Sequence, residues 1–224
     1  MKIIAKIQND FKEKFGIPRQ SGLAHTLISK IVFEPEYRVK EALRGIEGFS
    51  HLWIIWEFSE AKSEKWSPTV RPPRLGGNKR MGVFATRSPY RPNPIGLSSV
   101  KLVGTEETKE YGTVLLVSGA DLLDGTPIYD IKPYLPFTDA HPEAIGGFAE
   151  EVREDRLTVQ IDEELINKVD EEKRDGLIAV LKGDPRPSYQ SDPERIYGMK
   201  FAQYEVFFKV SDCKLAVTNI EVLR

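Results

Sequence analysis

The chain has 224 residues, with 34 acidic and 32 basic side chains, and its net charge is −2. This length and a 40% share of hydrophobic residues allow one large or two small domains with a true core. The single cysteine, Cys213, excludes an internal disulfide and a metal site built from several cysteines. The N-terminal run KIIAKIQND is too short and too charged for a signal peptide, and no apolar stretch reaches membrane-spanning length. We therefore expect a cytoplasmic protein that does not contact membranes.

The first half of the chain predicts short strands with alternating apolar and polar side chains. These strands cover residues 2–7, 25–33, 51–58, 100–105, 113–117 and 127–131. Residues 35–46 predict one short helix that begins with a proline and ends at a glycine. Short strands separated by glycine and proline turns are typical of an antiparallel barrel or sandwich, and the helix content is too low for a doubly wound Rossmann sheet. The predicted fold is mainly β, with a small antiparallel β-barrel.

The most unusual segment spans residues 66–98, WSPTVRPPRLGGNKRMGVFATRSPYRPNPIGLS. Its six prolines exclude a continuous helix and a central strand. The backbone is therefore held in stiff extended and turn conformations, and its basic side chains project from a frame with little freedom to lose on binding. Such a segment is either a preorganised site for an anionic or nucleotide-like ligand or a rigid, arginine-rich surface crossover.

Positive charge is concentrated in residues 62–101, which carry nine basic side chains and one acid. The local charge is +8, so the rest of the chain carries −10. This asymmetry predicts a focused basic patch that binds phosphates without general affinity for polyanions. The alternative is a basic face that is solvated and paired with acids after folding.

The composition changes near residue 138, because residues 139–195 carry sixteen acids against eight bases. Residues 156–161 predict a strand, and Asp162 predicts the cap of one helix that continues to Leu181. Residues 203–210 and 214–222 predict a hairpin. We therefore predict two domains: a β-barrel over residues 1–138 and a smaller α+β domain over residues 139–224.

The usual phosphate-binding and hydrolase motifs are absent, since no GxGxxG follows a strand and neither GxxxxGK[ST] nor GxSxG occurs. The three histidines are far apart in sequence, so no metal site is predicted. One acidic cluster, formed by Asp121, Asp124 and Asp130, lies in an apolar run. Asp124 precedes a glycine and is either a loop-capping turn residue or a carboxylate that contacts a ligand.

Five runs of the sequence resemble the TsaA-like family, and specifically its TrmO-type tRNA methyltransferases. They are EKFGIPRQSGL, RGIEGFSHLWIIWEF, RPPRLGGNKRMGVFATRSPYRPNPIGLS, DLLDGTPIYDIKPYLPF and DPRPSY. The resemblance implies a small β-barrel that binds S-adenosylmethionine without a Rossmann fold. It also implies methyl transfer to the N6 nitrogen of threonylcarbamoyladenosine beside the anticodon of tRNA, and a homodimer.

Carried over position by position, the resemblance also implies a set of contacts to S-adenosylmethionine. They are Pro18, Arg19, Gln20, Ser59, Glu60, Arg87, Leu97, Leu122, Leu123, Asp124 and Gly125. Leucine side chains suit an adenine face, and backbone groups of the 122–125 turn suit its edge. Candidates on the substrate side, for contact with the anticodon stem-loop or for holding the frame, are Arg74, Lys79, Arg80, Arg91 and Asn93.

Methyl transfer from a sulfonium is an in-line displacement, so alignment of donor and acceptor supplies much of the rate. Asp124 is the candidate acceptor of the proton that the nitrogen loses, and the substrate's own carboxylate is the alternative. Two other functions stay open: an RNA-binding module that binds the cofactor without turnover, and a methyltransferase for a small molecule or a protein. Because every implied cofactor contact precedes residue 126, we expect residues 1–141 to fold and bind the cofactor alone, while the acidic domain orients the tRNA.

Overall fold

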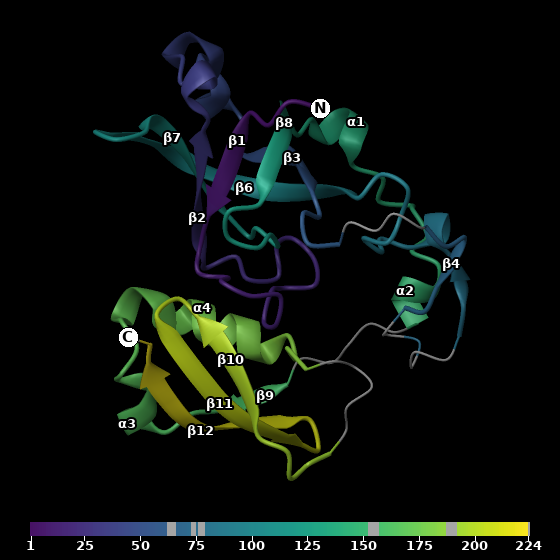
Figure 1. Cartoon of the computed structure of the whole chain (residues 1–224), viewed down its shortest axis with the longest axis vertical. Coiled ribbons are helices and arrows are strands. Elements are labelled where there is room, and N and C mark those ends of the chain that lie inside the picture. Colours follow the sequence, from purple (N-terminus) through teal and green to yellow (C-terminus); the bar gives the residue numbers. More distant parts are fainter. Residues whose placement is uncertain (62–65, 73–74, 76–78, 152–156, 187–191, 224) are drawn as a thin grey trace.

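The computed structural model describes residues 1–61, 66–72, 75, 79–151, 157–186 and 192–223. The chain is mainly β, as the sequence predicts. Six strands close into a barrel, and a four-stranded sheet with a helix lies beside it (Figure 1). No helix within the described ranges is long and apolar enough to cross a membrane.

Each barrel strand pairs with two antiparallel neighbours in the order β1-β2-β7-β6-β3-β8, and β8 returns to β1. The strands are β1 (Ala5–Gln8), β2 (Ile28–Phe33), β3 (His51–Glu57), β6 (Ile95–Thr108), β7 (Gly112–Ser118) and β8 (Pro127–Pro133). Alternation along β3 buries every second side chain. Ile7, Ile31 and Leu115 are among the fully buried residues of the barrel core.

The strand predicted over residues 100–105 is longer than expected, since β6 runs from Ile95 to Thr108. Its register against β7 shifts between Leu102 and Gly104. A shift of this kind is a bulge that bends a long strand, and here it lets one strand follow the curve of the barrel. The start of β6 therefore lies within the proline-rich segment rather than after it.

Residues 35–46 do not form the predicted helix. They form three 3₁₀ turns, η1 (Pro35–Tyr37), η2 (Lys40–Leu43) and η3 (Ile46–Gly48), and none of these turns contains a buried residue. Tyr37, Leu43 and Ile46 pack against the barrel core while only partly buried, one from each turn. The backbone of Val39 is extended, with ψ of 114°, so the turns do not join into one helix. Gly45, with φ of +86°, precedes η3 and redirects the chain between η2 and η3.

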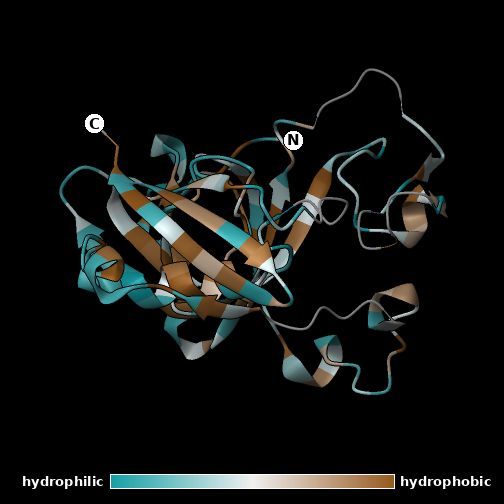
Figure 2. Ribbon diagram, turned by 90° about the horizontal axis from the view of Figure 1, so that it is seen from below, coloured by the Kyte–Doolittle hydropathy of each residue, from teal (hydrophilic) through white to brown (hydrophobic). Residues whose placement is uncertain are grey.

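The second sheet has the order β10-β11-β12-β9, with β9 parallel to β12. Its strands are β9 (Thr158–Gln160), β10 (Tyr197–Phe201), β11 (Tyr204–Ser211) and β12 (Lys214–Val222). Apolar and polar segments alternate along these strands, as a sheet with one packed face requires (Figure 2). The predicted hairpin is confirmed, and Asp212 and Cys213 turn it with φ of 48° and 61°.

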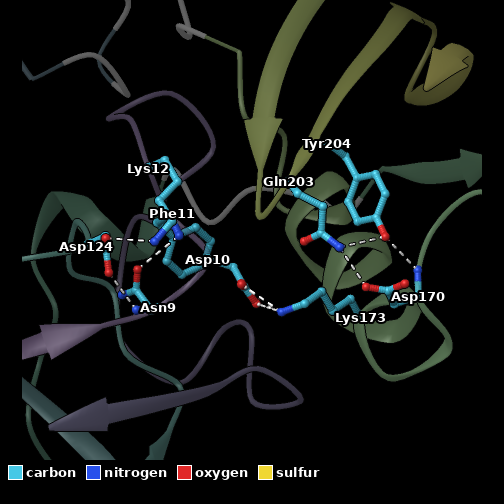
Figure 3. Close-up of polar contacts among 9 residues, drawn as sticks. All are labelled: Asn9, Asp10, Phe11, Lys12, Asp124, Asp170, Lys173, Gln203 and Tyr204. Atoms are coloured by element: carbon cyan, nitrogen blue, oxygen red, sulfur yellow. Dashed lines mark hydrogen bonds and ion pairs between the residues drawn. The ribbon is translucent and has the colours of Figure 1, made fainter. Parts of the chain in front are cut away.

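The single helix predicted from Asp162 to Leu181 is two helices, α3 (Glu163–Ile166) and α4 (Glu171–Lys182). Asp170 separates them, because its backbone is non-helical with ψ of 134°. Its N–H donates to the Tyr204 hydroxyl at 3.0 Å, and its carboxylate accepts from Gln203 at 2.7 Å (Figure 3). The run Asp170-Glu171-Glu172 is itself typical of a helix start, but the sequence prediction placed it inside one longer helix.

Ahead of β6, the described residues of the proline-rich segment contain only short elements, as predicted from its proline spacing. These are β4 (Thr69–Val70), which pairs with β5 (Met81–Gly82), and the turn η5 (Val83–Ala85). Figure 1 shows β4 at the side of the molecule and away from the barrel interior, and α2 (Phe148–Glu151) is a separate short helix later in the chain. The short helix α1 (Pro136–Asp139) follows the last barrel strand.

The loop between β1 and β2 joins the two halves of the molecule. Phe11, Ala24 and Leu27 belong by sequence to the barrel half, yet they are buried in the core of the second sheet. The approach is close, because a Cβ atom at Gly176 of α4 would overlap the Leu27 side chain. A cut near residue 141 would expose these side chains, so the structure argues against a barrel half that folds independently.

Polar contacts reinforce the same junction. Lys173 of α4 donates to both carboxylate oxygens of Asp10 at 2.8 Å (Figure 3). Both side chains are about one-fifth exposed, so solvent screens this ion pair less than a surface pair. The loop is therefore fixed by an apolar core and by a charge pair.

We expect Leu27→Ala to lower the free energy of unfolding by about 2–5 kcal/mol, because it removes a buried side chain from the core that the two halves share. Chemical unfolding monitored by circular dichroism measures the change. Leu23→Ala, on the same loop but 40% exposed, is the control and should change stability little. Equal stability of the two variants would show that the loop does not complete the second core.

Candidate functional site

A cavity of about 700 Å³ lies where the end of β3 and the start of β6 meet the loop after β1 and the turn after β7. Its volume lies within the usual range for small-molecule sites. Ten residues predicted from the sequence line it: Pro18, Arg19, Gln20, Ser59, Glu60, Arg87, Arg91, Asn93, Leu97 and Leu123. The fold thus gathers segments that are up to about a hundred positions apart into one site.

Other predicted residues lie elsewhere. Leu122 is fully buried in the barrel core, and Gly125 donates its N–H to the carbonyl of Ile7 rather than lining the cavity. Lys79 and Arg80 are exposed and do not line the cavity, and Arg80 donates to Thr69 at 2.9 Å. Arg74 lies outside the described residues.

Asp124, the candidate proton acceptor, does not line the cavity. Its carboxylate accepts from the backbone N–H of Asn9 at 2.8 Å and from Lys12 at 2.7 Å (Figure 3). It borders a separate, open depression together with Asp10 and Lys173. Asp124 therefore holds the loop after β1, as the turn-capping alternative describes in part, and its carboxylate lies outside this cavity.

Arg87 and Arg19 of the cavity donate hydrogen bonds to other parts of the chain. Arg87 donates to the side-chain oxygen of Gln20 at 2.6 Å, which couples the proline-rich segment to the loop after β1. Arg19 donates to the carbonyl oxygens of Asp184 and Arg186 at 3.2 and 2.8 Å. The cavity wall therefore includes a residue that is fastened to the C-terminal half.

Sequence reasoning missed a chain of hydrogen bonds that runs from the barrel core into the cavity. The indole N–H of Trp56 donates to the Ser98 hydroxyl at 2.9 Å, and that hydroxyl donates to Asp121 at 2.6 Å. Trp56 and Asp121 both line the cavity, whereas Ser98 is 1% exposed. Burial raises the pKa of Asp121, while the Ser98 hydrogen bond and the charge of Arg87 oppose that rise.

Strand register makes this chain possible. Trp56 of β3 lies opposite Gly96 of β6, and a Cβ atom at Gly96 would overlap the indole ring. The ring therefore covers Gly96 and reaches Ser98, two residues along the same strand face. The signal in the sequence was a glycine inside a strand pattern, which often marks a close approach.

Two further carboxylates, those of Glu57 and Glu60, line the cavity, and each has a partner. Glu57 accepts a hydrogen bond from Tyr129, and burial together with this hydrogen bond raises the pKa of Tyr129 to about 12. Glu60 forms an ion pair with Lys14 at 3.1 Å, and its side chain is half exposed. Asp121 is the cavity carboxylate whose pKa burial raises, while Glu57 and Glu60 are engaged by Tyr129 and Lys14.

The mouth of the cavity is aromatic and basic. Tyr90 lines it, and Phe84 and Trp66 continue outward with ring centroids 6.2 Å apart. These three rings are 53–71% exposed. The Arg91 guanidinium lies 6.0 Å from the Phe84 ring and donates to the Thr86 carbonyl, so it also holds the turn. Exposed rings beside cations are typical of surfaces on which nucleic-acid bases stack.

Within the described part of the chain, no group of three or more histidine, cysteine or acidic side chains is arranged to hold a metal ion. The cavity instead combines an apolar surface, hydrogen-bonding side chains, arginines and one desolvated carboxylate. This combination suits an organic ligand that carries both charges and an aromatic ring.

Comparisons with known proteins identify the family of this chain. Residues 6–140 match the family model described as "tRNA-methyltransferase O N-terminal domain", and residues 154–223 match "TrmO C-terminal domain". Over 97% of its length the chain is 40% identical to a tRNA (adenine(37)-N6)-methyltransferase of Escherichia coli, covering 96% of that protein. It is 39% identical, over 66% of its length and 74% of the relative, to a probable S-adenosyl-L-methionine-binding protein of Pyrococcus abyssi. A crystal structure of TrmO from Pseudomonas aeruginosa matches 98% of the chain and 95% of its own, with a TM-score of 0.79 and 33% identity.

We expect Gly96→Ala to displace the Trp56 ring and to lower the free energy of unfolding by about 1–3 kcal/mol, because the new methyl group has no room. Urea unfolding followed by tryptophan fluorescence measures both effects. Gly48→Ala is the matched control, since a Cβ atom there meets nothing within 4 Å. An unchanged emission spectrum and midpoint for Gly96→Ala would contradict the tight packing of this wall.

Proposed function

Because the chain belongs to the tRNA-methyltransferase O family, we propose that it transfers a methyl group from S-adenosylmethionine to the N6 nitrogen of threonylcarbamoyladenosine beside the anticodon of tRNA. The observation that carries the proposal is the agreement of two findings. The match to the Escherichia coli methyltransferase spans nearly the whole of both chains. Eight of the eleven cofactor contacts that the resemblance selected, from distant segments, line one cavity.

The cavity fits the methyl donor in size and in chemistry. Leu97 and Leu123 offer apolar surface for an adenine ring, and Arg87 with Gln20 offers charge and hydrogen bonds for the polar end of the ligand. Asp121 offers a negative charge. When bound, S-adenosylmethionine supplies an electrophilic methyl group on a sulfonium.

In the proposed reaction, the lone pair of N6 forms the new N–C bond as the methyl–sulfur bond breaks. The electron pair of that bond stays on sulfur, which becomes a neutral thioether, and the proton of N6 leaves. The main task of the protein is to hold nitrogen, methyl carbon and sulfur in line. Asp124 lies outside the cavity, so we assign the proton to the carboxylate of the substrate or to water rather than to that side chain.

The aromatic and basic mouth formed by Trp66, Phe84, Tyr90 and Arg91 is the surface that we assign to the anticodon loop. Unpaired bases stack on exposed rings, and cations meet the phosphates between them. Lys79 and Arg80 are exposed on the same segment, so we propose that they contact phosphates rather than the target base. A tRNA substrate also places the reaction in the cytoplasm.

We further propose a homodimer. Phe137 and Ile145 are 87% and 88% exposed, which is unusual for large apolar side chains on adjacent stretches of chain. A second copy that covers this stretch would remove that apolar surface from water. The division into a barrel of residues 1–138 and a domain of residues 139–224 stays part of the proposal, with the loop after β1 shared between them.

We expect Arg87→Ala to weaken S-adenosylmethionine binding by roughly tenfold to a hundredfold, because it removes a charged partner of Gln20 and of the ligand. Isothermal titration calorimetry measures the affinity. Arg71→Ala is the control, since Arg71 is exposed on the same segment and does not line the cavity. Equal losses in the two variants would place the donor site elsewhere.

We also expect methylation only of tRNA whose adenosine already carries the threonylcarbamoyl group. The carboxylate of that group gives the arginines of the cavity a bidentate partner, and its urea-like unit contains the N6 nitrogen. Labelled S-adenosylmethionine is incubated with tRNA from cells that can and cannot make this modification, and the nucleosides are then analysed. Equal methyl incorporation into both tRNA pools would rule out this substrate.

A further inference from the structure

We infer that Asp121 is the counter-charge for the sulfonium of the methyl donor, and that it makes the cavity prefer this cation over the neutral thioether left after transfer. The inference rests on the proposed function and assigns one of its determinants to one carboxylate. It follows from the position of Asp121 in the cavity wall, from its hydrogen bond to Ser98, and from the partners that the other cavity carboxylates already have.

The carboxylate of Asp121 has a fixed orientation. One oxygen accepts from the Ser98 hydroxyl at 2.6 Å, and Ser98 is itself held by the indole of Trp56 at 2.9 Å. A charged group held in this way needs no reorganisation when a ligand arrives.

A sulfonium can be recognised at this carboxylate by its charge alone. The Ser98 hydroxyl uses one of the roughly four lone-pair directions of the Asp121 carboxylate. A sulfonium carries a full positive charge without any N–H or O–H, so it is attracted to the carboxylate and does not compete with Ser98 for a hydrogen bond.

The other carboxylates of the cavity are less suitable. Glu60 is half exposed and already paired with Lys14 at 3.1 Å, so solvent and Lys14 both weaken its field. Glu57 accepts a hydrogen bond from Tyr129, whose pKa is raised to about 12. Arg87, the cation whose charge acts on Asp121, directs a guanidinium N–H to Gln20.

This arrangement has a consequence for turnover. The sulfur is positive before methyl transfer and neutral after it, so the attraction to Asp121 ends when the methyl group leaves. The spent ligand, S-adenosylhomocysteine, then binds less tightly than the donor and is released more readily. The same carboxylate would therefore serve donor selection and product release.

Calorimetry on the full chain, with S-adenosylmethionine and S-adenosylhomocysteine as the two probes, tests the inference without any methyl transfer. The unaltered protein should bind the cation at least about tenfold more tightly than the thioether. Asp121→Asn should weaken S-adenosylmethionine binding by roughly tenfold to a hundredfold and change S-adenosylhomocysteine binding by less than about threefold. Glu57→Gln is the matched control, and it should leave the ratio of the two affinities unchanged.

Three results would overturn the inference. The unaltered protein could bind both probes equally, which needs no variant and so does not depend on how Asp121→Asn folds. Asp121→Asn could weaken both probes by the same factor, which would put the carboxylate against a part that they share. Glu57→Gln, rather than Asp121→Asn, could abolish the preference. In contrast, failure of the unaltered protein to bind either probe would contradict the proposed function itself.

Discussion

The packing of Trp56 over Gly96 is the contact on which both the barrel and its cavity depend. The register of β3 against β6 places these two residues opposite each other, and only a glycine leaves room for the ring. The indole then reaches Ser98, and Ser98 holds Asp121 at the cavity wall. The packing of Trp56 on Gly96 thus fixes the orientation of the Asp121 carboxylate through Ser98. The same pairing of β3 with β6 stabilises the barrel and positions a charged group of the cavity.

The loop between β1 and β2 has two tasks for a related reason. Its apolar residues Phe11 and Leu27 complete the core of the second sheet, while Gln20 meets Arg87 in the cavity. Arg19 extends this link by donating to the carbonyl of Arg186. A movement of the C-terminal half would therefore displace Arg19 in the cavity wall, although the barrel half supplies most of the lining.

Much of this could be predicted from the sequence, and the limits have physical causes. Alternating residues revealed most of the barrel strands, and the proline spacing correctly excluded long elements among the described residues between Trp66 and Pro94, although the long strand β6 begins directly after the last proline. The short helix at residues 35–46 was predicted wrongly, because a local proline and glycine pattern does not show that Tyr37, Leu43 and Ile46 meet the barrel core from three separate turns. The role of Asp121 was missed since it depends on Ser98 and Trp56, which lie 23 and 65 positions away and meet only through strand register. Asp124 was a catalytic candidate from the family resemblance and from its place before a glycine. Its partners Asn9 and Lys12 lie 115 and 112 positions away, so local sequence could not reveal them.

The central claim is that this cavity holds the methyl donor, with its reacting sulfur beside Asp121. A crystal structure of the protein with bound S-adenosylhomocysteine tests this claim most directly. The account predicts the ligand between Leu97 and the Gln20–Arg87 pair, with the sulfur facing the Asp121 carboxylate. A ligand bound instead in the depression beside Asp124 and Lys173, or in this cavity with its sulfur turned away from Asp121, would contradict it.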